Sequence, residues 1–373
     1  MSADIHRGQR ARQGNQSNHA NKAGYKCAAD FFTKLSKLCL LAGRHPYKAA
    51  MNAETFNEWM KQVPRLTLRQ RELLRKRLDA LDGQHQALAV IELPGSTEPR
   101  SCPHCQGTDL DRHGQVSGLQ IYRCQICHRT FNSLTGTALA RLRKKDKWLG
   151  FSTALVPSQS LRQAASALGV HRNTTLRWRH RFLGSLKADR VATLQGIMEA
   201  DETYFLDSRK GSRKLDRPAR RRGGKVGKAG LSREQVCVLV ARDRTGQTLD
   251  WVMGRGQMTK AELASVLLPV LATDVLLVSD GNPTCRFFAQ NAHLSHEAIN
   301  LSAGVRVKGA VHVQNVNAYH GRLKRWLGRF HGIATCHLDN YLGWFRSLDN
   351  HHAHSGESAL AMALGKFPHL AVT

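Results

Sequence analysis

The sequence has no apolar run of about 18 residues, the length that crosses a bilayer, and its start, MSADIHRGQRARQGNQSNHANK, lacks the apolar core of a signal peptide. We therefore expect no membrane segment and a soluble, cytoplasmic protein. Acidic residues are also scarce, since 28 Asp and Glu face 56 Lys and Arg, which leaves a net charge of +28. Such a chain repels itself unless a polyanion neutralises it, so nucleic acid is the expected partner rather than an anionic membrane.

Disulfides are not expected in a reducing compartment, so the nine cysteines should be reduced or bound to metal. Four of them form two CxxC pairs, CPHC and CQIC, with 18 residues between the pairs. A tight turn within each pair can aim both thiolates at one ion, and the intervening segment is long enough for a hairpin. We predict a structural zinc ion whose four thiolates leave no position for a catalytic water. Its ligands are Cys102, Cys105, Cys124 and Cys127.

The segment SLRQAASALGVHRNTTLRWRHRFL predicts two helices joined by a sharp turn at Gly169. Ser160 and Gln163 can form a capping box at the start of the first helix. The second helix carries basic and polar side chains on its outward face, which suits phosphates and base edges in the major groove. We predict a DNA-binding helix-turn-helix, and an ordinary helical hairpin with a basic face is the alternative. The predicted DNA contacts are Arg172, Asn173, Arg177 and Arg181.

Beyond Gly196, apolar runs typical of strands alternate with helical stretches, which indicates an α/β domain. Asp201 lies in the first run, GIMEADETYF, and Asp280 ends a later one, DVLLVSDG. Two carboxylates on adjacent strands can share Mg²⁺ or Mn²⁺ ions and so support phosphoryl transfer. Aspartates at strand ends also cap helices and turns, so the pair alone does not establish a metal site. Glu202 should point to the opposite face of the strand and be a poor co-ligand.

A basic, glycine-rich stretch lies between the first two predicted strands, in the loop 206–232. Ten of the residues from Arg209 to Lys228 are Lys or Arg, and Asp216 is the one acidic residue among them. Such a run cannot bury itself, so we predict a mobile loop that contacts DNA phosphates, with a solvated insertion as the alternative. The predicted contacts are Arg220, Arg221, Arg222 and Lys225.

The order of these motifs, together with the helix NAYHGRLKR and the sequence YLGWF, resembles the ISXO-like DDE transposases of bacterial insertion sequences over about residues 60–350. The resemblance implies an RNase H-like catalytic domain that cuts and joins DNA at inverted-repeat ends, as a homo-oligomer in a synaptic complex at the nucleoid. Many relatives have a third acid, Glu, where this chain has Asn317, 37 residues after Asp280. Some relatives pair such an Asn with a Lys seven residues later, as Lys324 is here.

The resemblance implies that Asp201, Asp280 and Asn317 hold Mg²⁺ and that Lys324 contacts a phosphate. An asparagine offers only a neutral carbonyl oxygen, so the metal would bind more weakly than to three acids. His320 lies between Asn317 and Lys324 on the same helical face and remains an alternative third ligand.

We therefore expect a multidomain chain with small α-helical and zinc-ribbon modules, a helix-turn-helix and a C-terminal RNase H-like α/β domain. The expected parts are a basic, disordered tail (1–50), a helical segment (51–95), the ribbon (96–135), the helix-turn-helix (136–192) and the catalytic domain (193–373). Two other functions remain open. One is a non-catalytic DNA-binding regulator, and the other is an RNase H-like nuclease that hydrolyses DNA without joining it.

Overall fold

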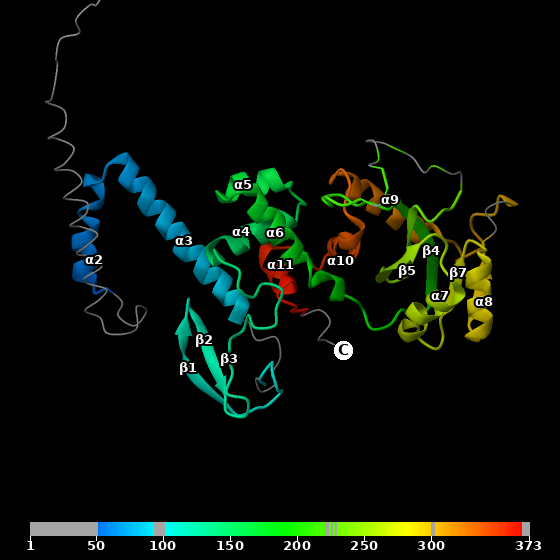
Figure 1. Ribbon diagram of the computed structural model, residues 1–373, viewed down its shortest axis with the longest axis horizontal. Helices are drawn as coiled ribbons and strands as arrows, with labels where there is room; N and C mark the ends of the chain where they lie inside the picture. The colour runs from blue at the N-terminus through cyan, green and yellow to red at the C-terminus, as the bar shows by residue number, and fades with distance from the viewer. Residues whose placement is uncertain are drawn as a thin grey trace, which may run out of the picture. The chain divides into compact units, whose positions relative to one another are not determined.

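The structure, a computed structural model, describes residues 51–92, 101–215, 217–218, 220, 224, 227, 230–299 and 303–367 (Figure 1). The expected tail, 1–50, lies outside them. The chain divides into two compact units, 1–75 and 76–373. None of the described helices is both long enough and apolar enough to cross a membrane.

The first unit contains short helical elements and the start of a long helix. Asn52 caps α2 by accepting a hydrogen bond from the Thr55 amide at 2.8 Å. Thr67 and Gln70 bond reciprocally, with the Thr67 amide 2.8 Å from Gln70 Oε1 and the Gln70 amide 3.3 Å from Thr67 Oγ1. These local bonds satisfy amides that a helix start leaves without partners. The elements are α2 (Ala53–Met60), η1 (Val63–Arg65) and α3 (Leu68–Glu92).

A small antiparallel sheet, in the order β1-β2-β3, follows α3. Ser117 and Gly118 join β1 to β2, and both have positive φ (51° and 80°), as a tight two-residue hairpin turn requires. Among the described residues, the buried apolar cluster of this sheet consists of Cys102, Cys124 and Phe131, with three partly buried side chains packed against it. So small a core is typical of a module whose folding depends on a metal. The strands are β1 (Leu110–Val116), β2 (Leu119–Cys124) and β3 (Thr130–Phe131).

The two helices predicted around Gly169 are present. Ser160 and Gln163 form the predicted capping box, and Gly169 ends α5 in the left-handed region (φ +62°). Phe151, Trp178 and Phe182 pack their rings edge-on in the core beneath these helices. The C-terminal helix α11 packs against α4 and α6, so this helical layer draws on segments distant in the sequence. Its elements are η2 (Lys145–Lys147), α4 (Trp148–Leu155), α5 (Leu161–Leu168), α6 (Arg172–Leu183) and α11 (Gly356–Ala363).

The remaining strands form a mixed five-stranded sheet in the order β6-β5-β4-β7-β8. The central strand β4 is antiparallel to β5 and parallel to β7. The expected α/β character is thus confirmed, whereas the expected domain boundaries remain predictions. The strands are β4 (Ile197–Leu206), β5 (Gln235–Asp243), β6 (Thr248–Arg255), β7 (Leu276–Ser279) and β8 (Ser295–Ala298). The helical elements are η3 (Leu186–Ala188), α7 (Lys260–Leu267), η4 (Leu268–Val270), α8 (Pro283–Asn291), α9 (Gln314–Gly328), η6 (Thr335–His337) and α10 (Leu338–Asp349).

The two faces of β4 serve different cores, because successive side chains of a strand point to opposite sides. Met198 and Ala200 belong to the apolar cluster that includes residues of α7 and α8. Ile197 and Phe205 pack against the cluster that includes residues of α9, α10 and α6. The odd-numbered positions of β4, among them Asp201, therefore face α9.

Candidate active site and metal centre

Of the two predicted catalytic aspartates, Asp201 lies on β4 and Asp280 directly follows the neighbouring strand β7. In the parallel pairing of β4 with β7, Ile197 is opposite Leu276 and Glu199 is opposite Val278. The same register, continued by two residues, brings Asp201 level with Asp280, which directly follows β7. The prediction that their strands are adjacent is thus confirmed.

Asp280 stands in a turn that hydrogen bonds hold in place. Asp280 Oδ1 accepts from the Asn282 amide at 3.1 Å, and Ser279 Oγ accepts from the Gly281 amide at 3.4 Å. Ser279 Oγ also lies 3.0 Å from His296 Nε2 on β8. Gly281 has a φ of +89°, which L side chains rarely adopt. The turn therefore requires glycine directly after the aspartate.

Glu202 ties this turn to β4 from the other face of the sheet. Asn282 Nδ2 donates to both oxygens of Glu202, at 2.8 and 3.1 Å. Asn282 is also the N-cap of α8, where its Oδ1 accepts from the Thr284 amide. Glu202 thus positions the segment that carries Asp280.

The acidic groups at this edge of the sheet repel one another. Burial, together with the nearby Asp280 and Glu202, raises the pKa of Asp201 to about 7, although Lys324 opposes the rise. Burial also raises the pKa of Glu202. A divalent cation beside Asp201 and Asp280 would remove this repulsion, so the donor set fits a hard cation.

Helix α9 brings His320 against Asp201. His320 Nδ1 lies 3.6 Å from Asp201 Oδ2, and the histidine is 6% exposed. Burial lowers its pKa to about 4, with a smaller effect of Lys324, so the ring is neutral near pH 7. Its Nε2 has no hydrogen-bond partner within the part of the chain that the structure describes. A neutral imidazole with a free nitrogen can ligate a metal.

Asn317 and Lys324 lie on the same helix, one turn before and one turn after His320. Both are exposed. Lys324 is close enough to Asp201 to affect its pKa. The Asn317 side chain has no hydrogen bond to either aspartate among the described residues. Lys324 and His320 therefore interact with Asp201, which lies near Asp280, whereas Asn317 makes no such interaction among the described residues.

Glu199, a buried carboxylate on the same face of β4 as Asp201, was not predicted from the sequence. It is fully buried, and its Oε2 accepts from the Val316 amide at 2.9 Å, in the first turn of α9. Arg244, directly after β5, forms an ion pair with Glu199, and His312 Nδ1 lies 3.3 Å from the Glu199 Oε1. Glu199 therefore fixes the N-terminus of the helix that faces Asp201. The sequence signal was a charged residue at an inward position of an apolar strand.

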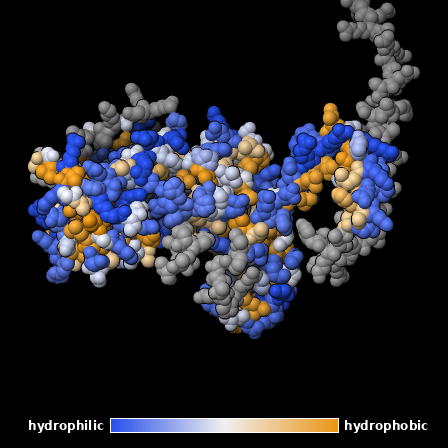
Figure 2. Space-filling view, turned by 180° about the vertical axis from the view of Figure 1, so that it is seen from behind, coloured by the Kyte–Doolittle hydropathy of each residue, from blue (hydrophilic) through white to orange (hydrophobic). Residues whose placement is uncertain are grey.

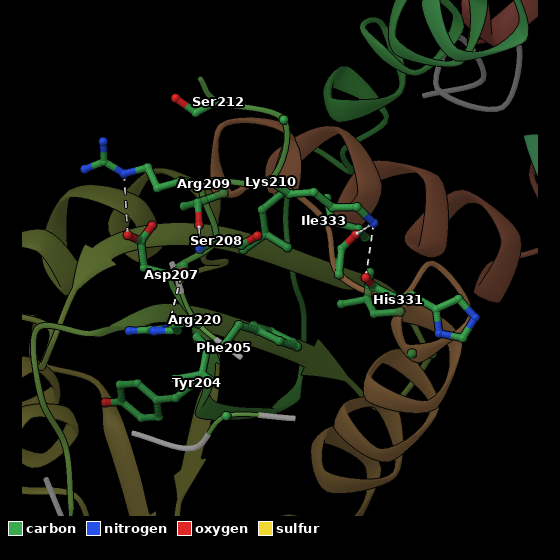
Figure 3. Close-up of a pocket in the computed structure, with 18 of the residues that line it drawn as sticks. Tyr204, Phe205, Asp207, Ser208, Arg209, Lys210, Ser212, Arg220, His331 and Ile333 are labelled. Carbon is green, nitrogen blue, oxygen red and sulfur yellow. Dashed lines mark hydrogen bonds and ion pairs between the residues drawn. The ribbon is translucent and has the colours of Figure 1, made fainter. Parts of the chain in front are cut away.

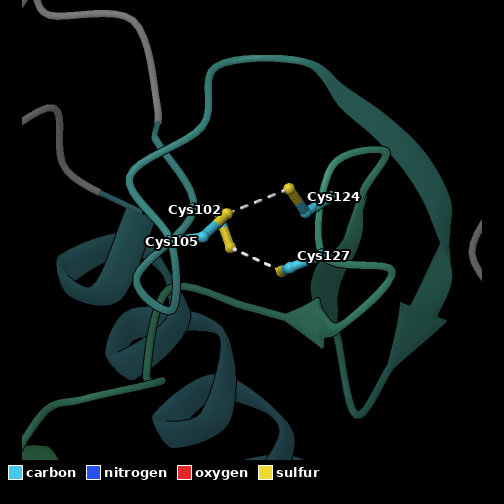
Figure 4. A group of neighbouring side chains, drawn as sticks. All are labelled: Cys102, Cys105, Cys124 and Cys127. Carbon is cyan, nitrogen blue, oxygen red and sulfur yellow. Dashed lines mark hydrogen bonds between the residues drawn. The ribbon is translucent and has the colours of Figure 1, made fainter.

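The four predicted zinc ligands form one cluster (Figure 4). Their sulfur atoms all lie within 4.8 Å of one another, and two pairs, Cys102 with Cys127 and Cys105 with Cys124, are 3.6 Å apart. A tetrahedral ion with Zn–S bonds of about 2.3 Å needs sulfur separations of about 3.8 Å. Gln106 and His128, each following the second cysteine of a pair, both have positive φ (62° and 55°). The donor set and turns fit zinc.

A cavity of about 800 Å³ lies beyond the end of β4 (Figure 3). Lys324 lines it, as does Lys210, whose Nζ donates to the carbonyls of residues 330, 331 and 332 after α9. Arg220 donates to the Asp207 carbonyl and to Glu234, both at 3.1 Å. The first part of the basic loop is thus bonded to the protein itself. The other predicted contacts of this loop, Arg221, Arg222 and Lys225, lie outside the described residues.

The predicted DNA-reading side chains of α6 are accessible. Arg172, Asn173 and Arg177 are exposed. Arg181 is also exposed, but its guanidinium donates to the carbonyls of Ala138 and Ala140. Three of the four side chains are therefore free of such backbone contacts among the described residues.

Comparison with known protein families finds a similarity in this part of the chain. The model of the ISXO2-like transposase domain matches residues 193–346. Among solved structures, a pre-cleavage Mos1 transpososome is similar at 14% identity and a TM-score of 0.21, covering 58% of this chain and 78% of that chain. A Mos1 strand transfer complex has 15% identity and a TM-score of 0.18, with the same coverage. No curated protein matches the chain. The family match spans β4, β7 and α9, the elements that carry or adjoin Asp201, Asp280 and His320.

Proposed function

We propose that this chain is an insertion-sequence transposase that binds terminal inverted repeats and catalyses metal-dependent cleavage and strand transfer of DNA. The observation that carries the proposal is that Asp201 on β4 is level with Asp280, directly after the neighbouring β7, within the residues that the transposase-domain model matches. The raised pKa of Asp201 supports it, because an unpaired carboxylate kept beside two other acids is stable only with a proton or a cation.

In this proposal, residues of the chain bind the metal, contact the DNA and position the site. Asp201 and Asp280 hold the metal, and Lys324 contacts a phosphate of the DNA as a point charge. Bound Mg²⁺ or Mn²⁺ would stabilise the charge on the attacking and leaving oxygens. Glu202, through Asn282, and Glu199, through the start of α9, keep these groups in register. Cleavage and joining are both phosphoryl transfers, so one site serves both.

The third ligand is proposed to be Asn317, with His320 as the alternative that its contact with Asp201 favours. Asn317→Ala and His320→Ala separate the two when Mn²⁺ binding is measured by calorimetry beside cleavage. Loss of both metal affinity and cleavage in Asn317→Ala, with metal affinity retained in His320→Ala, supports Asn317. The reverse pattern assigns the position to His320.

DNA binding is proposed for α5 and α6 as a helix-turn-helix and for the basic loop. The net charge of +28 and the exposed arginines of α6 support it. An RNase H-like fold is proposed for residues 193–373, supported by a sheet that is antiparallel on one side of β4 and parallel on the other. Because two element ends must be joined, we expect a homo-oligomer at work.

Structural zinc is proposed for the four-cysteine cluster. We expect one zinc per chain by elemental analysis. A strong chelator should remove it and expose residues 101–133 to proteolysis, since a core this small does not fold without the ion. Resistance of the metal-free ribbon to protease would contradict the assignment.

The catalytic proposal is tested with a DNA donor that carries inverted-repeat ends, in the presence of Mg²⁺ or Mn²⁺. Wild type should cut the ends and form joined products, and Asp201→Asn should do neither while still binding DNA. Asp274→Asn, an exposed aspartate in the turn before β7, is the matched control and should keep full activity. A wild-type protein that binds but never cuts would be a regulator. Cutting without joined products would identify a nuclease.

A further inference from the structure

A second hollow lies between α5 and α6 on one side and the turn between α9 and α10 on the other. Its volume is about 1600 Å³, and the ends of β4 and β6 complete its walls. We call it the α6 groove. Residues 207–212 and 331–333 line both this groove and the smaller cavity that contains Lys324. The groove therefore leads from the exposed face of α6 toward the candidate active site.

The α6 groove carries a large excess of positive charge. Its one acidic lining residue among those described, Asp207, is 5% exposed and already has Arg255 at 3.0 Å. Lys210 is bonded to backbone carbonyls. Three exposed arginines on the walls have no ion pair and no side-chain hydrogen bond in the described part of the chain. They are Arg162 on α5, Arg172 on α6 and Arg329 after α9.

The start of α5 adds to this field. Residues 160–163 line the groove. The capping box satisfies the amides of Ser160 and Gln163, so the amides of Leu161 and Arg162 and the positive end of the helix dipole are left to face an anion. Arg179, 3% exposed, also lines the groove, and its Nε has no partner among the described residues. The combined surface suits several anionic oxygens in succession rather than one small anion.

The walls of the groove are held together by packing. The Arg179 guanidinium lies 5.5 Å from the ring centres of both Phe330 and Trp344. Trp326 Nε1 donates to Ser158 Oγ at 2.8 Å, and the rings of His180 and His337 stack at 3.9 Å. The groove is therefore preformed, so binding in it needs little rearrangement.

We propose that the α6 groove binds the sugar–phosphate backbone of the same DNA duplex that α6 holds and directs it toward Asp201 and Asp280. Arg162 and Arg329 are the new phosphate contacts, and Arg172 joins the groove to the reading face of α6. This inference rests on the proposed DNA-binding function. It adds a binding surface that connects the exposed face of α6 with the candidate active site. Contacts to phosphates fix register and carry no base preference.

The test is the salt dependence of binding to a random-sequence duplex, measured by fluorescence anisotropy without divalent metal. Each phosphate contact contributes about 0.9 to the slope of log K against log salt, so the double variant Arg162→Gln/Arg329→Gln should lower the slope by about 1.8. The double Arg→Lys variant should restore it, because the charge is kept. Arg286→Gln, an exposed arginine on α8 at the opposite face of the sheet, should leave the slope unchanged.

Cys336 provides a second readout, because it is exposed and lines the groove. Duplex DNA should slow its alkylation, as followed by peptide mass spectrometry. A wild-type slope in the double variant, or alkylation of Cys336 at the same rate with and without DNA, would overturn the groove proposal. Neither measurement requires cleavage. If the groove proposal holds and the catalytic proposal fails, the slope change and the protection of Cys336 will be seen, but the wild-type protein will not cut DNA.

Discussion

At the scale of single residues, Glu199 and Asp201 show how environment assigns different roles to two acids on one face of one strand. Glu199 meets Arg244, His312 and an amide of α9, and so it has donors on every side. Asp201 meets two further acids and a neutral histidine. The charge of Glu199 is balanced by protein groups, whereas the charge of Asp201 would be balanced by a cation. Glu199 therefore anchors α9, and Asp201 remains available to bind a metal.

We predict that Glu199→Ala strongly destabilises the protein, because it leaves Arg244 and the start of α9 without their buried partner. Removal of one member of such a pair costs about 3–5 kcal/mol. Glu199→Gln keeps an oxygen for the Val316 amide and should lose less. Urea unfolding measures both. Glu297→Gln, which breaks the exposed pair with Lys308, is the control and should change stability by less than about 1 kcal/mol. Equal losses in Glu199→Ala and Glu297→Gln would refute the anchoring role.

His180 gives a pH dependence whose sign follows from its burial. Burial, together with the facing His337 and with Arg179, lowers the pKa of His180 to about 4. Above about pH 6.5 the ring is neutral in both folded and unfolded chains and has no effect. Below that pH the unfolded chain takes up a proton that the folded chain excludes, so stability falls between pH 6.5 and about 4. His180→Gln should therefore lose less stability than wild type when urea midpoints at the two ends of this range are compared. Parallel losses would show that His180 titrates normally in the fold.

The candidate site was predictable from the sequence where local patterns carry it. Asp201 follows from an acid within an apolar run and Asp280 from an acid that ends one, and β4 and β7 are indeed adjacent. The contact of His320 with Asp201 was not predictable, because it depends on how deeply α9 packs onto the sheet. The engagement of Arg220 with Glu234 and a backbone carbonyl was missed for the same reason, since composition does not reveal which cations of a loop bond to the protein.

At the scale of elements, the contact between α10 and η3 depends on a missing side chain. A Cβ on Gly343 would lie 2.6 Å from the Leu186 carbonyl oxygen, and backbone cannot move aside cheaply. We predict that Gly343→Ala destabilises the protein by about 1–3 kcal/mol, the usual cost of overpacking. Thermal unfolding measures it.

Gly321 of α9 is the matched control, because it is also helical but a Cβ there would meet nothing within 4 Å. Gly321→Ala should stabilise the protein by up to about 1 kcal/mol through helix propensity alone. If Gly343→Ala stabilised the protein to the same degree, the close approach of α10 to η3 would be wrong.

Element boundaries were predictable where a residue's own backbone decides them. The capping box of Ser160 with Gln163 and the left-handed Gly169 set the ends of α5 through bonds within a few residues. The partner of α11 was not predictable, because its buried Ala359, Leu360 and Ala363 would suit many apolar surfaces. Capping residues and other local signals determine where a helix begins and ends. Which helices pack against each other depends on tertiary packing.

At the scale of the whole molecule, the chain returns after the sheet to complete its helical layer. Helix α11 packs against α4 and α6, and Ser185 Oγ donates to the Ala363 carbonyl at 3.1 Å. Lys366 Nζ donates to the Ile91 carbonyl at 2.8 Å, so the segment after α11 also reaches the end of α3. The layer that carries α6 therefore depends on residues more than 150 positions away, as the 178-residue separation of Ser185 from Ala363 shows.

This arrangement predicts where a core defect will be felt. Leu360→Ala removes a fully buried side chain of α11 and should cost about 2–5 kcal/mol. Because stability is distributed in local cooperative units, hydrogen exchange should quicken most in α4, with the centre of β5 still protected. Leu263→Ala removes an equally buried side chain, but from the cluster beneath α7 and α8. In this variant hydrogen exchange should quicken most in α8, and α4 should stay protected. If both variants speeded exchange equally in α4 and α8, the helical layer and the α7–α8 side of the sheet would unfold as one unit. A substitution in α11 would then destabilise the active site as much as it destabilises α6 beside the groove.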